Sequence, residues 1–266
     1  METRLEKLFL NKPLDHLSVF VTAGFPHKNS LLEIIPLLHE SDCDLIEIGI
    51  PYSDPLADGT IIQNSSSVAL KNGMNLNLIL QQVKEVRAKT QKPIILMGYL
   101  NSVLKFGIEK FYLTCHDVGV DGLIIPDLPL HEYKQMHEPF IKRYKLNFSF
   151  LITPETEYER ALELASCSSG FVYLVSSNAT TGSSKAMNSN LTSFIDTLKR
   201  NGLKIPILIG FGIKNSAHFQ KCSAISNGAI IGSAFIQLLG SSLDLKKDIP
   251  YFIHSIKTKT HDHSIK

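Results

Sequence analysis

A short apolar run with a single charge in its middle, Asp44-Leu45-Ile46-Glu47-Ile48-Gly49, is typical of a buried strand in a parallel sheet. Further apolar runs bounded by Gly, Pro, Asn or Asp recur along the chain. We predict strands over residues 17–22, 44–49, 93–97, 122–126, 147–152, 170–175, 205–210 and 228–231. Amphipathic segments between them predict helices over residues 31–40, 60–71, 76–89, 107–118, 155–166, 191–201 and 216–226.

Alternation of strands with helices implies a parallel sheet. Each strand–helix unit spans roughly 33 residues, the size of a βαβ repeat, and eight such units close into a (β/α)8 TIM barrel. An open, doubly wound sheet is the structural alternative, but no GxGxxG follows the first strand, which excludes its usual dinucleotide-binding version. We expect one barrel domain over residues 1–266, with a short N-terminal helix at 2–10 and an extra short helix at 233–239 after the eighth strand.

The composition excludes several classes of protein. Lys and Arg number 27 and Asp and Glu number 25, so the net charge is +2, which argues against a protein that coats nucleic acid or an anionic membrane. No run approaches the ~18 apolar residues of a membrane-spanning helix, and no apolar signal core follows the N-terminus. The 4 cysteines form no CxxC pair and the 10 histidines show no metal-binding spacing. We expect a cytoplasmic protein without a metal.

The most informative single residue is Glu47. Side chains alternate along a strand, so Glu47 shares a face with Gly49, while Ile46 and Ile48 face the outer helices. Glu47 should therefore point into the barrel near the carboxyl end of its strand, where such barrels carry their active sites. A buried carboxyl can act as a general acid and base near neutral pH. The alternative is an ion pair in the core, but the neighbouring inward positions hold no Lys or Arg.

The segment after this strand carries two more carboxylates. Asp54 and Asp58 lie in the turn-rich run 51–59, over the same face of the barrel. Either could simply close a local turn, and Asp58 could also cap the helix predicted at 60–71. With Asp58 close to Glu47, the two would form a carboxylate pair.

Glycine-containing clusters follow the last three predicted strands, at residues 180–183, 210–213 and 231–234. Glycine allows backbone N–H groups to approach a ligand closely, and barrels often bind phosphate with these loops and the start of a short helix. The clusters therefore indicate a phosphorylated substrate. The wall between them and Glu47 suits a packed core or a flat apolar ligand. Its predicted members are Phe20, Met97, Ile124, Leu151, Tyr173 and Phe211. The polar stretch Ser176–Asn190 predicts a long loop, either a lid or a disordered segment.

The run from Glu47 to Gly59 resembles the tryptophan synthase α subunit family. Residues 20–26, 97–101, 126–129, 210–213 and 232–234 are similar to that family in the same order and at the same spacing. The resemblance implies a TIM-barrel lyase of tryptophan biosynthesis that cleaves indole-3-glycerol phosphate to indole and glyceraldehyde 3-phosphate. It implies no cofactor in this chain, and a β-subunit partner that uses pyridoxal phosphate within an α2β2 heterotetramer.

The resemblance also implies roles for individual residues. Glu47 corresponds to the catalytic acid and base, Asp58 to the second catalytic carboxylate, and Tyr173 to a tyrosine near the bond that is cleaved. Thr181 is expected to approach Asp58 when its loop closes. The phosphate cradle is implied at Gly182, Gly212, Gly232 and Ser233. The β-subunit interface is implied at Asp54, Pro55 and Asn101.

One segment departs from the family pattern. Residues 176–182 retain Thr181 and Gly182 but lack the Arg and the further Gly expected shortly after the sixth strand. This departure motivates an alternative, a weakly catalytic regulatory subunit that mainly binds and activates the β subunit. A further alternative is another phosphate-binding barrel, such as a sugar-phosphate isomerase or an aldolase. An aldolase of the Schiff-base kind needs an inward Lys on a strand, and the sequence offers none.

Overall fold

Parallel strands form the centre of the molecule in the computed structural model, which describes residues 3–176, 184–210 and 212–258. The sheet order is β5-β4-β3-β2-β1-β9-β8-β7-β6. The strands are β1 (His16–Thr22), β2 (Leu45–Gly49), β3 (Ile94–Met97), β4 (Gly122–Ile124), β5 (Asn147–Phe148), β6 (Leu151–Ile152), β7 (Val172–Val175), β8 (Ile207–Gly210) and β9 (Gly228–Ile231).

The two ends of this order belong to one stretch of chain, so the sheet closes on itself. Ser149 and Phe150 connect β5 to β6. The Ser149 backbone N–H donates to the Leu123 carbonyl of β4 at 3.0 Å, and the Phe150 carbonyl accepts from the Tyr173 N–H of β7 at 3.0 Å. The predicted barrel is therefore confirmed, with its fifth strand interrupted in the middle. We propose that the chain forms one domain, because strands from its beginning and its end share this sheet.

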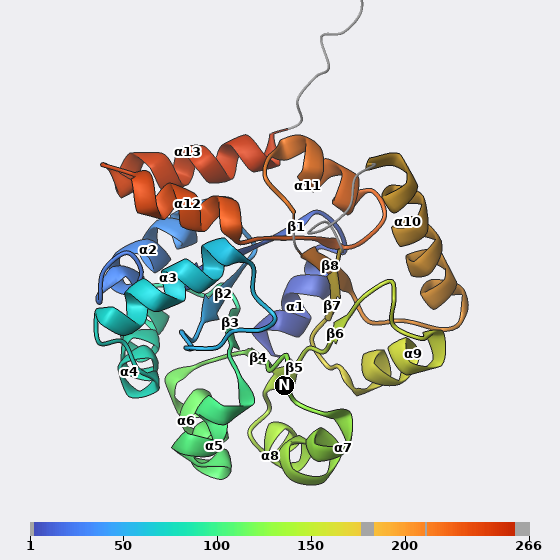
Figure 1. Ribbon diagram of the computed structural model, residues 1–266, viewed down its shortest axis with the longest axis horizontal. Helices are drawn as coiled ribbons and strands as arrows, with labels where there is room; N and C mark the ends of the chain where they lie inside the picture. Colours follow the sequence, from blue (N-terminus) through green and yellow to red (C-terminus); the bar gives the residue numbers. More distant parts are fainter. Residues whose placement is uncertain (1–2, 177–183, 211, 259–266) are drawn as a thin grey trace, which may run out of the picture.

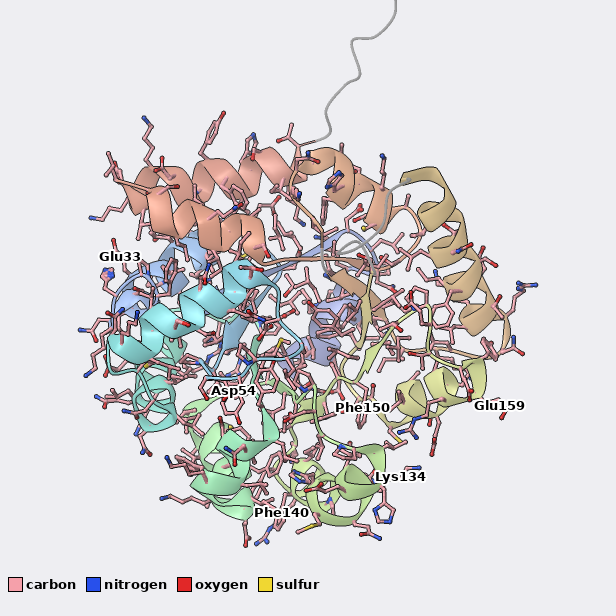
Figure 2. All side chains as sticks on the ribbon, viewed as in Figure 1. Glu33, Asp54, Lys134, Phe140, Phe150 and Glu159 are labelled. Carbon is pink, nitrogen blue, oxygen red and sulfur yellow. The ribbon has the colours of Figure 1, made fainter. Side chains whose placement is uncertain are left out.

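Helices surround the barrel, and the first of them lies at one end of it (Figure 1). They are α1 (Arg4–Asn11), α2 (Ser30–Glu40), α3 (Thr60–Lys71), α4 (Leu76–Arg87), α5 (Leu100–Phe106), α6 (Ile108–Val118), α7 (Leu130–Glu132), η1 (Tyr133–His137), α8 (Glu138–Arg143), α9 (Tyr158–Cys167), α10 (Ser184–Arg200), α11 (Ser216–Ser223), α12 (Ser233–Ser241) and α13 (Leu245–Lys257). In Figure 2 the labelled side chains Glu33, Lys134 and Glu159 lie at the outer edge of this ring, whereas Asp54 and Phe150 lie closer to its centre.

The N-terminal helix α1 lies within the helix ring, at the end of the barrel where the strands begin (Figure 1). Arg4 pairs with Asp121, just before β4, at 2.9 Å. The Phe9 ring packs edge-on against His16, the first residue of β1, at a centroid distance of 4.7 Å. The short helices predicted at 2–10 and 233–239 are thus present as α1 and α12, and α1 covers the floor, by which we mean the amino ends of the strands.

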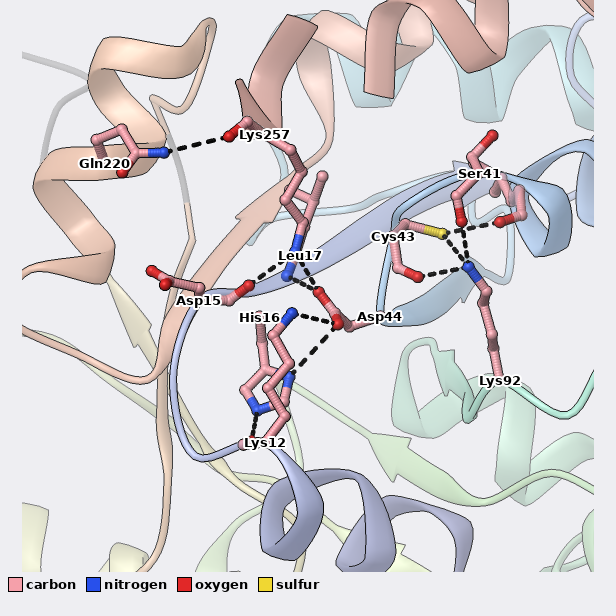
Figure 3. A network of polar contacts seen from close by, with 11 residues as sticks. Lys12, Asp15, His16, Leu17, Ser41, Cys43, Asp44, Lys92, Gln220 and Lys257 are labelled. Atoms are coloured by element: carbon pink, nitrogen blue, oxygen red, sulfur yellow. Dashed lines mark hydrogen bonds and ion pairs between the residues drawn. The ribbon is translucent and has the colours of Figure 1, made fainter. Parts of the chain in front are cut away.

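The same floor holds a network of charges around Asp44, the residue before β2 (Figure 3). Its carboxylate accepts from Lys12 Nζ at 2.6 Å and from Lys257 Nζ at 2.7 Å. The Leu17 backbone N–H donates to it at 2.8 Å. Lys12 follows α1 and Lys257 ends α13, so a single carboxylate joins both ends of the described chain to the sheet.

The prediction of one loop over residues 176–190 is wrong for its second half, because α10 already begins at Ser184. Residues 177–183 lie outside the described residues. Leu191, Ile195 and Leu198 of α10 are buried against the strands. Since extending an established helix is far easier than starting one, this anchored half accounts for helix formation in the polar residues before it.

Candidate active site

Glu47 is fully buried on β2. The Ser18 hydroxyl of β1 donates to Glu47 Oε1 at 2.6 Å, whereas Oε2 has no hydrogen-bond partner among the described residues. Burial raises the pKa of Glu47 to about 7, and the hydrogen bond from Ser18 acts in the opposite direction. Within the described ranges no cation pairs with it, so the carboxyl is poised to exchange a proton near neutral pH.

Asp58 lies in the loop between β2 and α3. Tyr99 Oη donates to Asp58 Oδ2 at 3.0 Å and accepts from the Ala57 backbone N–H at 2.9 Å. Burial raises the pKa of Asp58, and the bond from Tyr99 opposes this. The interpretation of Asp58 as a helix cap is wrong, since α3 is capped by Gly59 without a side-chain hydrogen bond. The side chain turns towards Tyr99 instead, which leaves it available at the mouth of the barrel.

Tyr173 of β7 is influenced electrostatically by both carboxylates. Burial raises the pKa of its phenol well above the usual value, and the charges of Glu47 and Asp58 add to this effect. Both carboxylates therefore lie within electrostatic reach of one hydroxyl. Glycines at strand ends make room for the rings: a Cβ on Gly210 would lie 2.3 Å from the Tyr173 ring, and one on Gly49 would lie 2.3 Å from the Phe20 ring.

Asp58, Tyr173 and Phe20 line a cavity of about 210 Å³ at the carboxyl ends of the strands. Its wall is mostly apolar, with polar groups at two places. The lining residues are Phe20, Asp58, Ile61, Ile62, Met97, Tyr173, Gly212, Ile213, Lys214, Ile230, Gly232 and Ser233. Glu47, Ile124 and Leu151 are not among them. Thr181, Gly182 and Phe211 lie outside the described residues, so their assignments stay predictions.

One side of the cavity is suited to an anion. Gly232 caps α12 and Ser233 is its first residue, so the unpaired backbone N–H groups of the first helical turn lie at the cavity wall. Gly212 and the exposed Lys214 approach from the loop after β8. Sequence reasoning missed Lys214, although its position two residues after Gly212 is the signal that could have found it.

A second hollow of about 430 Å³ lies on the same face, outside the barrel mouth. It is lined by Tyr52, Asp54, Leu56, Ala57, Tyr99, Pro126 and Asp127. Of the three residues predicted to meet a partner, Asp54 and Asn101 are exposed, whereas Pro55 is buried. The neighbouring Leu56 is 94% exposed. Tyr99 contacts both this hollow and Asp58, so the surface and the site share a side chain.

Two absences among the described residues bear on the chemistry. No group of three or more His, Cys, Asp and Glu side chains is arranged to hold a metal ion in the ranges that the structure describes. Across those ranges, every helix is too short or too polar to cross a bilayer.

Comparison with known proteins agrees with this geometry. The family model described as tryptophan synthase alpha chain matches residues 11–262. The tryptophan synthase alpha chain of Parabacteroides distasonis is 42% identical over 254 residues, which cover 96% of this chain and 99% of the relative. That of Flavobacterium psychrophilum is 46% identical over 223 residues, 84% of this chain and 88% of the relative.

Solved structures show the same fold. The crystal structure of tryptophan synthase from M. tuberculosis in its aminoacrylate-bound form contains a chain with a TM-score of 0.85 and 26% identity, covering 96% of this chain and 98% of that one. The tryptophan synthase A-subunit from Pyrococcus furiosus has a TM-score of 0.81 and 31% identity, covering 91% and 97%. The barrel fold and these similarities agree: the chain belongs to the tryptophan synthase alpha chain family.

Proposed function

We propose that this chain is a lyase that cleaves indole-3-glycerol phosphate into indole and glyceraldehyde 3-phosphate. The observation that carries the proposal is the arrangement of one cavity. The cavity is lined by Asp58, by aromatic and apolar side chains and by the start of α12, and the charge of the buried Glu47 acts on Tyr173 in its wall. A substrate with a flat apolar ring, a hydroxylated linker and a phosphate would offer a matching group to each of these features.

The bond to be broken joins indole C3 to the carbon that carries the side-chain hydroxyl. Protonation of C3 makes the ring nitrogen an electron acceptor, and loss of the hydroxyl proton turns the attached carbon into the aldehyde as the C–C bond breaks. One proton is added and one removed, so a single group can supply and recover it. Glu47 is suited to this because its pKa lies near neutrality.

Asp58 is suited to a different task. As positive charge grows on the indole nitrogen, a carboxylate that accepts its N–H stabilises the transition state. At the other end, the N–H groups of α12 with Gly212 and Lys214 would hold the phosphate, so that binding energy positions the reacting carbon. Tyr173 would pack against the ring between these groups.

The reaction as written needs only proton transfers, so this chain has no cofactor of its own in our proposal. Pyridoxal phosphate would belong to a β-subunit partner, within a cytoplasmic α2β2 heterotetramer. The exposed Asp54, Leu56 and Asn101 near the barrel mouth support a protein contact at that face. The near-neutral net charge of +2 supports neither nucleic acid nor membrane as a partner.

The test is cleavage by the purified chain, followed through the aldehyde product, in the native protein and two variants. Glu47→Gln should abolish cleavage while glycerol phosphate still binds, and Asp58→Asn should lower kcat sharply without changing the circular dichroism spectrum. Asp117→Asn, an exposed carboxylate on α6, serves as the matched control. Substantial turnover by Glu47→Gln would show that Glu47 is not the catalytic acid and base.

The same assay, run with and without the β subunit, distinguishes the lyase from the alternative of a weakly catalytic regulatory subunit. Cleavage that is present alone and increases with the partner supports the lyase. Negligible cleavage under both conditions, together with activation of the β subunit, favours a regulatory role.

A further inference from the structure

Ser18 on β1 makes a buried hydrogen bond to the carboxyl of Glu47. In the pairing of β1 with β2, Phe20 lies beside Glu47, and Ser18 lies two residues earlier on the same face of β1. Both Ser18 and Glu47 are fully buried. The Ser18 hydroxyl donates to Glu47 Oε1 at 2.6 Å, and no other described residue hydrogen-bonds to this carboxyl. The nearest strand neighbours of Glu47, Phe20 on β1 and Ile95 on β3, are apolar and offer no donor from their side chains.

The bond makes the two oxygens of Glu47 unequal. Oε1 is occupied by the Ser18 hydroxyl, whereas Oε2 is buried without a partner in the described residues. A buried polar atom without a partner is unfavourable, and such atoms in native proteins call for a functional explanation. A substrate that approaches Oε2 would supply the missing partner.

We propose, on the basis of the proposed lyase function, that Ser18 is a positioning residue for Glu47. Its hydroxyl holds Oε1 and thereby presents Oε2 as the oxygen that exchanges protons with the substrate. The Ser18 hydroxyl is engaged with Glu47 Oε1, so Ser18 acts on the reaction through that carboxyl.

The same contact keeps the carboxyl available as a base. The hydroxyl donates to the ionised carboxylate and can continue to donate to Oε1 when the proton sits on Oε2. Burial raises the pKa of Glu47, and the Ser18 bond is the contact that opposes it. Among the described residues, Tyr173 of β7 is the titratable group whose pKa responds to the charge of Glu47, and it carries no positive charge. Without Ser18, Glu47 would hold its proton more tightly at neutral pH.

The primary test reads Glu47 directly in the full-length protein without substrate. Infrared difference spectra of protein labelled with ¹³C-glutamate follow the carboxyl through its titration, and Glu47→Gln identifies its band. Ser18→Ala should raise the titration midpoint by about one pH unit, a tenfold change in proton affinity. Ser18→Thr keeps the hydroxyl and should return the midpoint towards that of the native protein. Ser226→Ala removes another buried hydroxyl, at the floor, and should leave the midpoint unchanged.

A second measurement, of kinetics and ligand affinity, distinguishes loss of Glu47 positioning from a general loss of structure. In Ser18→Ala the pH–rate limb that reports Glu47 should move to higher pH, and kcat at pH 7 should fall about fivefold as the ionised fraction falls. The affinity for glycerol phosphate should stay within about twofold, since Ser18 does not reach the phosphate side. If Ser18→Ala does not fold, Ser18→Cys, a weaker donor of similar size, should give an intermediate midpoint.

An unchanged midpoint in Ser18→Ala or Ser18→Cys would overturn the proposal, as would an equal shift in Ser226→Ala. Failure of the lyase assignment looks different. In that case Glu47→Gln would still cleave indole-3-glycerol phosphate, while the effect of Ser18 on the Glu47 band would remain measurable.

Discussion

Tyr99 and Asp58 are 41 positions apart in the chain, yet the Tyr99 hydroxyl donates to Asp58 Oδ2 at 3.0 Å. The same hydroxyl accepts from the Ala57 N–H at 2.9 Å. One side chain from the start of α5 thus holds the Asp58 loop in place. Its ring stacks on Tyr52 at a centroid distance of 5.0 Å, which connects the site to the outer surface of the barrel mouth.

Tyr99→Phe should therefore lower kcat/KM about tenfold while it keeps the stacking on Tyr52. A hydrogen bond to a charged group contributes about 1.5–3 kcal/mol, and 1.4 kcal/mol is tenfold in rate. Steady-state kinetics measure the change, with Tyr144→Phe as the control, because the Tyr144 hydroxyl contacts Glu109 on the outer surface. Native kcat/KM in Tyr99→Phe would show that Asp58 is held by other contacts.

Burial of Glu47 predicts a stability that depends on pH. The pKa rises from its usual value near 4.5 to about 7 on folding, so the native state binds the proton more tightly than the unfolded chain. Stability is then lost as pH rises from about 4.5 through about 7, by up to about 3 kcal/mol. Glu47→Gln has no such proton to lose. Urea unfolding at pH 5 and pH 8 should show the variant gaining stability relative to the native protein at the higher pH, and a constant difference would contradict the burial argument.

Lys214 predicts how the substrate phosphate is held. Lys214→Gln should raise KM about fivefold with little change in kcat, because an exposed ion pair contributes up to about 1 kcal/mol and acts equally on the bound substrate and the transition state. The effect should weaken at high salt, where exposed charges are screened. Lys221→Gln, on α11 and outside the cavity, should leave KM unchanged. A fall in kcat with KM unchanged would contradict the assignment of Lys214 to phosphate binding.

The charge network at the floor predicts a second pH effect, of opposite sign. Burial alone would raise the pKa of Asp44, but the charges and hydrogen bonds of Lys257 and Lys12 outweigh it and hold the pKa below its usual value. Its stabilisation is present above the unfolded value near 3.8 and is lost as pH falls through the lower folded value.

Asp44→Asn should therefore cost about 3 kcal/mol of unfolding free energy at pH 7, because two cations lose their partner. The difference from the native protein should shrink towards zero near pH 2, as measured by chemical denaturation. Glu163→Gln, which breaks an exposed pair with Lys134, should have a much smaller effect. An equal loss at both pH values would assign the effect of Asp44→Asn to packing and not to charge.

Local pattern was enough to predict the barrel and the burial of Glu47. Each strand is a short apolar run between residues that favour turns, and the two-residue repeat of a strand assigns Glu47 and Ile48 to opposite faces. Local pattern was not enough for α13, where Ile249, Ile253 and Ile256 have helical spacing but Pro250 interrupts the run. Nor did it predict the start of α10, since the residues before Leu191 are helical only because the following half is anchored.

The sequence by itself predicted the candidate site residues and the alternation of side chains along each strand, because side-chain direction depends only on the local backbone. The tertiary structure alone decided their partners: Ser18 for Glu47, Tyr99 for Asp58, and Lys214 beside the start of α12. These contacts join residues that are tens of positions apart in the chain or belong to different elements. The geometry of these contacts is set when the sheet closes. The separation of two residues along the chain does not determine how close their side chains lie in the folded protein.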